Sequence, residues 1–345
     1  MDEGLAPAPR EHGWAGVAVA LAAFLLVPVV PIPVGLVNPP SVVPIDQTLW
    51  LLLPLVAVCF VAGWLRGGPL GLAVVWVMLA TVALARTSAR GPQSYDDLAR
   101  GWGLLVAGTF GLVSALGSQR RLLSRALAAV GLALILSWVL VGIGRVAPNR
   151  AQQLFAEQFA ARNGLLAVYL ERMAAARPEA RDIVDTQLRL SGESSVFAAQ
   201  LFVALLALES VVACTLAWAI YHRLSRTRLG APLGSLREFR FNDQMIWGLV
   251  AGITMAVIPG LGRLRQWGLN LLLFFSALYF WRGLGVIAWH GRRLTRPLRV
   301  AMILAGVLAG PLTVAAALAL GVNDTWFDLR RRGPAGPSAD QPRST

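Results

Sequence analysis

The sequence has no lysine, three histidines and two cysteines, and charged residues of every kind are scarce. They make up 14% of the 345 residues, whereas a soluble domain carries roughly 25%. Hydrophobic residues account for 56% of the chain and repeatedly form long runs. A single water-soluble core is therefore excluded, and the composition predicts an integral membrane protein.

The scarcity of reactive residue types also excludes common chemistries. A lysine-free chain cannot contain a GxxxxGK[ST] phosphate-binding loop, and HExxH, CxxC and GxSxG motifs are absent from the sequence. The histidines, His12, His222 and His290, are far apart. We therefore expect no enzymatic activity, no metal and no cofactor. Cys59 and Cys214 lie in apolar runs, as buried thiols do, and predict no disulfide framework.

Arginine supplies all of the side-chain positive charge behind the net charge of +13. The arginines lie mostly in short connections between apolar runs, where they hold helix ends at phosphate head groups. The expected partner is therefore the lipid bilayer and not nucleic acid. Nine strict crossings would place the basic loops at 120–125, 223–240 and 292–299 on one side, the cytoplasmic one. The same count places the arginines at 330–332 outside, so the sidedness of the termini stays open.

Nine apolar runs approach the ~20 residues that a spanning helix requires. Three prolines, Pro28, Pro31 and Pro33, are expected to break or kink the far half of the first run. The predicted fold is an all-α polytopic transmembrane bundle with eight or nine spans. The runs are 14–37, 48–65, 69–86, 98–117, 122–144, 195–221, 243–259, 267–290 and 297–320.

Residues 145–194 differ from the rest because charges occur throughout, with apolar residues at helical spacing. The pattern predicts an amphipathic helix, and Pro178 starts a second short one. The segment lies on the membrane surface, covers the mouth of the bundle or is a solvated connector. The expected organisation is a tail (1–13), an N-terminal transmembrane bundle (14–144), this amphipathic connector (145–194), a C-terminal transmembrane bundle (195–328) and a disordered basic tail (329–345).

Two ionisable residues, Glu209 and Arg282, lie well inside apolar runs. At ~1.5 Å rise per residue, both would lie about 21–23 Å along their helices if these begin with the runs. A lone buried charge costs several kcal/mol, so we expect Glu209 and Arg282 to pair inside the bundle. In the alternative, Arg282 extends to the membrane surface, and Glu209 is protonated or hydrogen-bonded.

Other polar and small residues lie in the later runs. Asn270 and Tyr279 share a run with Arg282 and are candidates for lining a ligand pocket, although aromatic residues at helical spacing more often serve packing. Two GxxxG pairs predict close helix packing or, alternatively, a dimer face. The pairs are Gly248–Gly252 and Gly306–Gly310.

Three segments, FNDQMIWGLVAG, GLNLLLFFSALYFWRGLGVIAWH and GVNDTWFDLRRR, carry a resemblance in their order and spacing. They resemble the DUF2232 (YybS-like) family of bacterial integral membrane proteins, and the N-terminal spans fit that family in hydropathy. The most specific motif residues are Asp324, Trp326, Phe327, Asp328 and Arg330. The family is distantly similar to the substrate-binding subunits of energy-coupling-factor transporters and to MreD, which implies a helical bundle with a central pocket. It implies no catalytic residues.

Two functions in the bacterial inner membrane fit these observations. In the first, the protein binds a small molecule, or helps to transport one, in a pocket among the C-terminal spans, lined by Glu209, Asn270, Tyr279 and Arg282. In the second, it is an MreD-like scaffold that binds membrane-protein partners through its helix faces. A polar-lined cavity at Arg282 would favour the first, and a solid apolar core with an exposed groove the second.

Overall fold

The computed structural model describes residues 13–28, 42–86, 93–116, 121–143, 150–225, 229–260, 262–292 and 294–330. Within these ranges the regular structure is helical and contains no β-strand, in agreement with the predicted all-α class. The predicted tails at 1–13 and 329–345 fall almost entirely outside these ranges. The chain forms two compact units, Met1–Leu233 and Gly234–Thr345, which are described separately.

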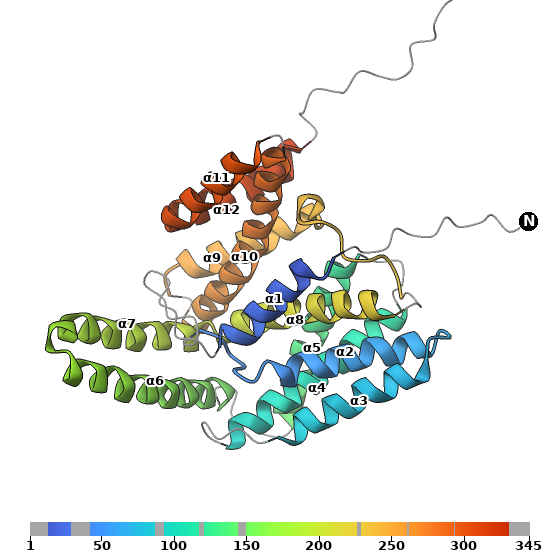
Figure 1. The fold of residues 1–345 in the computed structure, drawn as a ribbon, viewed down its shortest axis with the longest axis horizontal. Helices are drawn as coiled ribbons and strands as arrows, with labels where there is room; N and C mark the ends of the chain where they lie inside the picture. Colours follow the sequence, from blue (N-terminus) through green and yellow to red (C-terminus); the bar gives the residue numbers. More distant parts are fainter. Residues whose placement is uncertain are drawn as a thin grey trace, which may run out of the picture. The chain divides into compact units, whose positions relative to one another are not determined.

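The first unit is built around α2 and α8, as Figure 1 shows. α2 packs against α3, α4 and α8, and α5 packs against α4 and α8. Large side chains such as Trp218 and Phe110 are fully buried at these contacts. The helices of this unit are α1 (Ala15–Leu26), α2 (Leu49–Trp64), α3 (Leu70–Ala85), α4 (Gln93–Leu116), α5 (Leu122–Ile143), α6 (Arg150–Ala176), α7 (Arg181–Gln200) and α8 (Phe202–Leu224).

A proline inside α2 determines how α4 packs against it. Pro54 has no N–H, so the carbonyl of Trp50, four residues earlier, lacks its usual helical donor. Gly103 of α4 lies directly against that carbonyl, because a Cβ built on Gly103 would fall 2.3 Å from the Trp50 oxygen. The absence of a side chain at Gly103 therefore lets the two backbones touch where α2 is interrupted.

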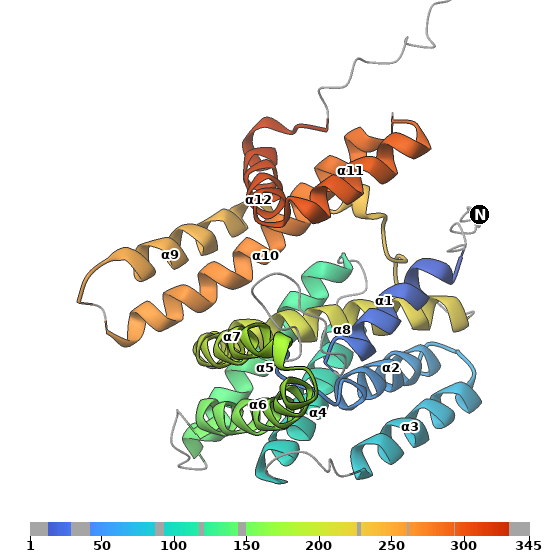
Figure 2. The same cartoon turned by 60° about the vertical axis from the view of Figure 1, so that its left-hand side comes forward.

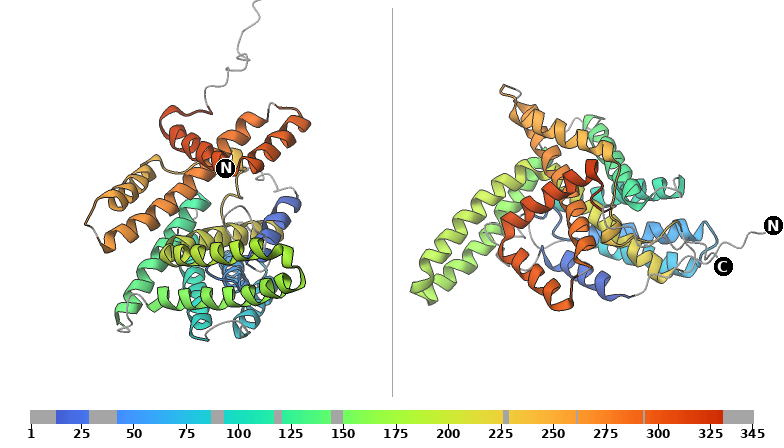
Figure 3. Two further views of the ribbon diagram at one scale, coloured as in Figure 1. Left: turned by 90° about the vertical axis from the view of Figure 1, so that its left-hand side faces the viewer. Right: turned by 90° about the horizontal axis from the view of Figure 1, so that it is seen from above.

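The helices α6 and α7 form an antiparallel hairpin that projects from the rest of the first unit (Figure 3). Pro178 lies in the short 3₁₀ turn between them, Pro178–Ala180, where the sequence predicts the start of a second helix. Ala174 and Val184 are buried close to this turn. The second helix continues to Gln200, beyond the predicted end of the connector at residue 194.

The second unit is organised around α10, whose N-terminal half packs against α9 and whose C-terminal half crosses α12, as Figure 2 shows. Its elements are η3 (Leu236–Glu238), η4 (Asp243–Met245), α9 (Ile246–Val257), α10 (Arg263–Gly291), α11 (Arg296–Leu308) and α12 (Gly310–Phe327). The predicted C-terminal bundle begins at residue 195, whereas the unit begins at Gly234. The difference arises because α8 packs against α2 and α5 of the first unit.

The predicted count of eight or nine spans is not confirmed. Among the described residues, four helices are long and apolar enough to cross a membrane, and a fifth span is obtained if α11 and α12 are counted as one bent span. The four shorter apolar helices, α1, α2, α3 and α9, contain 12 to 16 residues. At ~1.5 Å per residue they reach about 18–24 Å, less than the ~30 Å of a hydrocarbon core.

Prolines account for two of these differences in length. The seventh run ends as a helix at Val257 because Ile258, which precedes Pro259, is extended, the conformation favoured before proline. The ninth run is interrupted near Pro311, where α11 and α12 meet at 107°. In these two places the apolar run in the sequence extends beyond the helix that it forms.

Candidate functional site

The second unit is centred on a crossing of α10 and α12 at which the two backbones touch. A Cβ built on Gly283 of α10 would lie 1.7 Å from the carbonyl oxygen of Ala317, and one built on Gly321 of α12 would lie 1.9 Å from that of Tyr279. On α12, the buried residues Ala317, Gly321 and Asp324 follow one another at spacings of four and three, so they share one face. This face brings the Asp324 carboxylate to α10.

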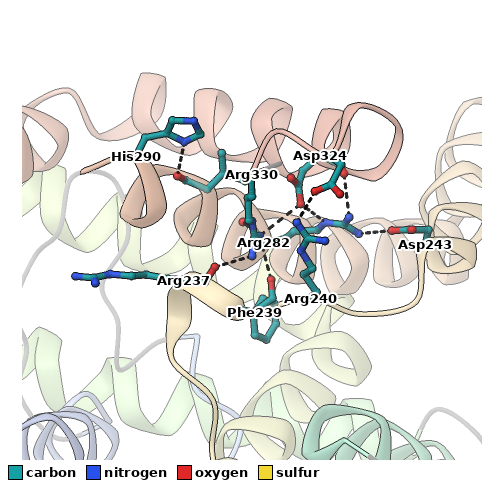
Figure 4. Close-up of polar contacts among 10 residues, drawn as sticks. Arg237, Phe239, Arg240, Asp243, Arg282, His290, Asp324 and Arg330 are labelled. Carbon is teal, nitrogen blue, oxygen red and sulfur yellow. Dashed lines mark hydrogen bonds and ion pairs between the residues drawn. The ribbon is translucent and has the colours of Figure 1, made fainter. Parts of the chain in front are cut away.

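Arg282, next to Gly283, is bound to that carboxylate (Figure 4). Its Nε donates to Oδ2 of Asp324 at 2.9 Å, its Nη2 to the Asp324 carbonyl at 3.1 Å, and its Nη1 to Oδ1 of Asp243 at 2.7 Å. The Asp324 carbonyl belongs to the last turn of α12, where no helical donor follows. Arg282 therefore neutralises a buried carboxylate and also caps a helix C-terminus, where positive charge is favourable.

Arg330, just beyond α12, connects the same centre to the segment that enters the unit. Its Nη1 donates to the Arg237 carbonyl at 2.7 Å, and its Nη2 donates to the carbonyls of Phe239 at 3.0 Å and Arg282 at 3.1 Å. The same Nη2 lies 3.5 Å from Oδ2 of Asp324. Figure 4 shows Arg330 reaching these groups from the end of α12. A guanidinium serves this purpose because it presents several donors in fixed directions.

The charges of this centre balance. Arg282 and Arg330 face two carboxylates, Asp324, which is fully buried, and Asp243, whose side chain is 62% exposed. Burial lowers the pKa of the Arg330 guanidinium from its ordinary value, and the nearby Asp324 carboxylate opposes this shift. The arrangement joins α10, α12 and the segment before α9, and the contacts named here contain no nucleophile–base pair.

The motif that carries the family resemblance divides between the interior and the surface. Asp324 and Arg330 belong to the buried centre, and Asp328 pairs with Arg240. Asp328 also ends α12 in a left-handed conformation, with φ of 39°, which aspartate tolerates better than most residues. Trp326 and Phe327 are more than half exposed, as expected of aromatic residues that contact lipid head groups.

Glu209 belongs to the first unit. The prediction that it pairs with Arg282 was wrong, because each of the two side chains binds other groups. Arg282 binds Asp324 and Asp243, whereas Oε2 of Glu209 accepts a hydrogen bond from the Ile45 N–H at 3.0 Å. The predicted agreement in depth also fails. Glu209 is seven residues into α8 and Arg282 nineteen into α10, or about 10 and 28 Å along their helices.

The other proposed lining residues, Asn270 and Tyr279, are both buried on α10. The Asn270 amide donates to the carbonyl of Gln266 one turn earlier, at 2.9 Å, and the Tyr279 ring packs edge-on against Phe241. Each of the two side chains is therefore already engaged in part by a contact within the protein. A ligand-binding role for either residue stays a prediction.

The two GxxxG pairs differ in the structure. Gly248 and Gly252 lie against α10, because a Cβ on Gly248 would meet the Phe275 ring at 2.2 Å and one on Gly252 would meet the Leu272 nitrogen at 2.7 Å. Gly306 lies in α11 and Gly310 begins α12, so the second pair does not form a face of one helix. Apart from its chain neighbours and the local helix backbone, no described atom comes within 4 Å of a Cβ built on Gly310.

Sequence reasoning missed the partners of Arg282 and the glycines of the crossing. Asp324 was assigned to a family motif and Asp243 to the start of a span, and neither was weighed as a counterion. A usable signal was present, because Asp324 follows Ala317 and Gly321 at helical spacing and directly extends an apolar run. The described residues contain no group of three or more histidine, cysteine, aspartate or glutamate side chains placed to hold a metal ion.

Comparison with known proteins gives a match to a protein family. A family model described as "Predicted membrane protein (DUF2232)" matches residues 17–325, which is most of the chain. The similarity therefore extends from the C-terminal segments through the N-terminal helices. No curated protein and no solved structure matches the chain.

Proposed function

Because this chain belongs to the DUF2232 family of predicted membrane proteins, we propose that it is a non-catalytic scaffold of the bacterial inner membrane. In this proposal the transmembrane helices hold the protein in the bilayer as a multi-pass protein. The α6–α7 hairpin binds a protein partner, and the C-terminal unit is a rigid element held together by its internal charges.

The hydrogen bonds of Arg282 and Arg330 support a structural role for the C-terminal unit. All three nitrogens of its guanidinium group donate to Asp324 or Asp243, and both terminal nitrogens of Arg330 donate to backbone carbonyls. A ligand anion would have to displace these short internal contacts from a buried site, which is costly. The cations of the described C-terminal site are thus already used to hold helices together.

The surface of the hairpin is the observation that carries the proposal. Neither α6 nor α7 is among the helices apolar enough to cross a membrane. Even so, Tyr169 is 59% exposed and Ile183 is 72% exposed, on the two helices near the turn. Residues 150–200 contain six arginines and six acidic residues, so the hairpin has no excess positive charge to attract anionic lipid. Exposed apolar side chains among charges of both signs suit a protein partner.

Photo-crosslinking in cells tests this role. A photoreactive residue at position 169 or 183 is expected to crosslink the protein to one species of the same mass. A photoreactive residue at the exposed Asp185, which is displaced by about 200° around α7 from Ile183, is the matched control and is expected to give little of this crosslinked species. Ile183→Asp should abolish the crosslink from position 169 while the helix content stays unchanged in circular dichroism. Equal crosslinking from all three positions, or none from any, would contradict the proposal.

Small-molecule binding is the second candidate, and one observation favours it. Oε1 of Glu209 is buried and has no hydrogen-bond partner among the residues that the structure describes. A ligand with a hydrogen-bond donor would satisfy it. Native mass spectrometry of the purified protein distinguishes the candidates. A bound molecule present in the wild type and at least tenfold depleted in Glu209→Gln would support binding, whereas identical spectra would leave the scaffold as the better account.

A further inference from the structure

The segment before α2, residues 43–47, is held by side chains from three helices. The Tyr95 hydroxyl of α4 donates to the Pro44 carbonyl. Arg162 of α6 donates to the carbonyls of Val43 at 2.9 Å and Pro44 at 3.3 Å. From α8, Glu209 accepts the N–H of Ile45. This short segment therefore connects α4, α6 and α8 of the first unit through polar groups.

Glu209 is the least satisfied of these groups. Within the described part of the chain its side chain makes one hydrogen bond, through Oε2, and Oε1 is buried without a partner. The residue is 9% exposed and lies within a helix long and apolar enough to span the membrane. An ionised carboxylate with one neutral donor at such a position carries a desolvation penalty that the single bond does not offset. A neutral carboxyl group needs no counterion and retains the bond to Ile45.

The surrounding charges do not supply a free counterion. Arg162 is the cation that acts on Glu209 electrostatically, and its Nη2 already lies 3.2 Å from Oδ1 of Asp46. Asp46 acts on Glu209 in the opposite sense. On α4, Asp96 is 4.0 Å from Arg100, and Tyr95 is a neutral phenol. Ionised Glu209 would therefore have to share the charge of Arg162 with Asp46.

From this geometry we propose that Glu209 is a proton-binding site of the first unit. In the resting protein the carboxyl group carries a proton on Oε1, while Oε2 accepts the Ile45 N–H. Release transfers this proton to water and leaves a carboxylate. The new charge then competes with Asp46 for Arg162, which is anchored on α6. Protonation of Glu209 thus sets the strength with which α6 is held to residues 43–47.

The link to α6 rests on the proposed function of the hairpin, but the proton-binding site does not. If the hairpin gave no crosslinks, the proposed partner would be ruled out, and the proposal that Glu209 carries a proton would be unaffected. Conversely, if Glu209 proved to be ionised at neutral pH, the proposed proton-binding site would be ruled out, and the proposal of a partner for the hairpin would be unaffected. The two ideas therefore fail through different measurements.

Infrared spectroscopy of the full chain in lipid nanodiscs at pH 7 tests the site. The wild type is expected to show a carboxylic-acid C=O band that is lost in Glu209→Gln and kept in Glu193→Gln, the matched control, which makes the same change at a glutamate whose side chain is 64% exposed. Glutamine preserves the acceptor for Ile45, so Glu209→Gln is expected to fold. If it does not fold, wild-type protein labelled with ¹³C-glutamate shows whether the band belongs to a glutamate, because a glutamate band must shift and an aspartate band must not. Among the described residues, Glu209 is the one buried glutamate. A wild-type spectrum without this band, or a band that neither the substitution nor the label affects, overturns the proposal.

Discussion

Replacing Asp324 with asparagine is expected to lower the free energy of unfolding by about 3–5 kcal/mol, the usual penalty for breaking a buried ion pair from one side. The substitution preserves shape but leaves Arg282 and Arg330 facing each other's charge in a buried site, with only the exposed Asp243 opposite. Chemical unfolding of the detergent-solubilised protein, followed by circular dichroism, measures this loss.

The matched control for this prediction is Asp243→Asn, which removes the other carboxylate bound by Arg282. Because the Asp243 side chain is 62% exposed, water already screens its charge, and we expect a loss of under about 1 kcal/mol. The double variant Arg282→Met/Asp324→Leu should be less damaged than the sum of its single changes, because it leaves no unpaired buried charge between these two positions. Equal losses for Asp324→Asn and Asp243→Asn would show that burial does not govern this network.

The second large effect is expected from Gly283→Ala. The added methyl group would lie 1.7 Å from the Ala317 carbonyl oxygen, and a backbone atom cannot move aside as a flexible side chain can. Since α10 and α12 must separate to accept it, we expect a loss of at least about 3 kcal/mol, the upper end of ordinary overpacking. The midpoint of thermal unfolding, measured in the same detergent, reports it.

Gly108→Ala in α4 provides the comparison for this change. Among the described residues, no side chain or distant backbone atom lies within 4 Å of a Cβ at Gly108, which is inside the helix, so the substitution should be neutral or stabilise by up to about 1 kcal/mol. Should Gly283→Ala prove as benign as Gly108→Ala, the close approach of the two backbones would have to be abandoned.

Helices were the predictable part of this fold, because a long apolar run determines helix type without help from distant residues. The turn between α2 and α3 was also predictable, since the glycines after Arg66 permit it, and Gly67 takes a positive φ of 89°. Helix lengths were not predictable in the same way. They depend on where the backbone leaves the helix, as at Ile258, and a hydropathy pattern does not record this.

The partners of the buried charged residues could not be predicted from the sequence, for a different reason. Arg282 was correctly predicted to need an acidic partner, but the distance along the chain to Asp324 carries no information about which carboxylate is near in space. For Glu209 the partner is a backbone N–H at Ile45, and every residue except proline has one. The crossing at Gly283 and Gly321 was missed because the two glycines lie on different helices, where no single-helix spacing rule applies.

The order of the charges along the chain has a consequence for biosynthesis. Asp243 precedes Arg282 by 39 residues, whereas Asp324 follows it by 42. At the ~5–20 residues per second of translation, about 2–8 seconds separate the emergence of Arg282 from that of its buried partner. Asp243 is the first carboxylate of the network that the ribosome delivers. In the folded protein Asp243 is the more exposed partner of Arg282 and contributes less to stability. While α12 is still being synthesised, however, Asp243 is the carboxylate of this network that is available to Arg282.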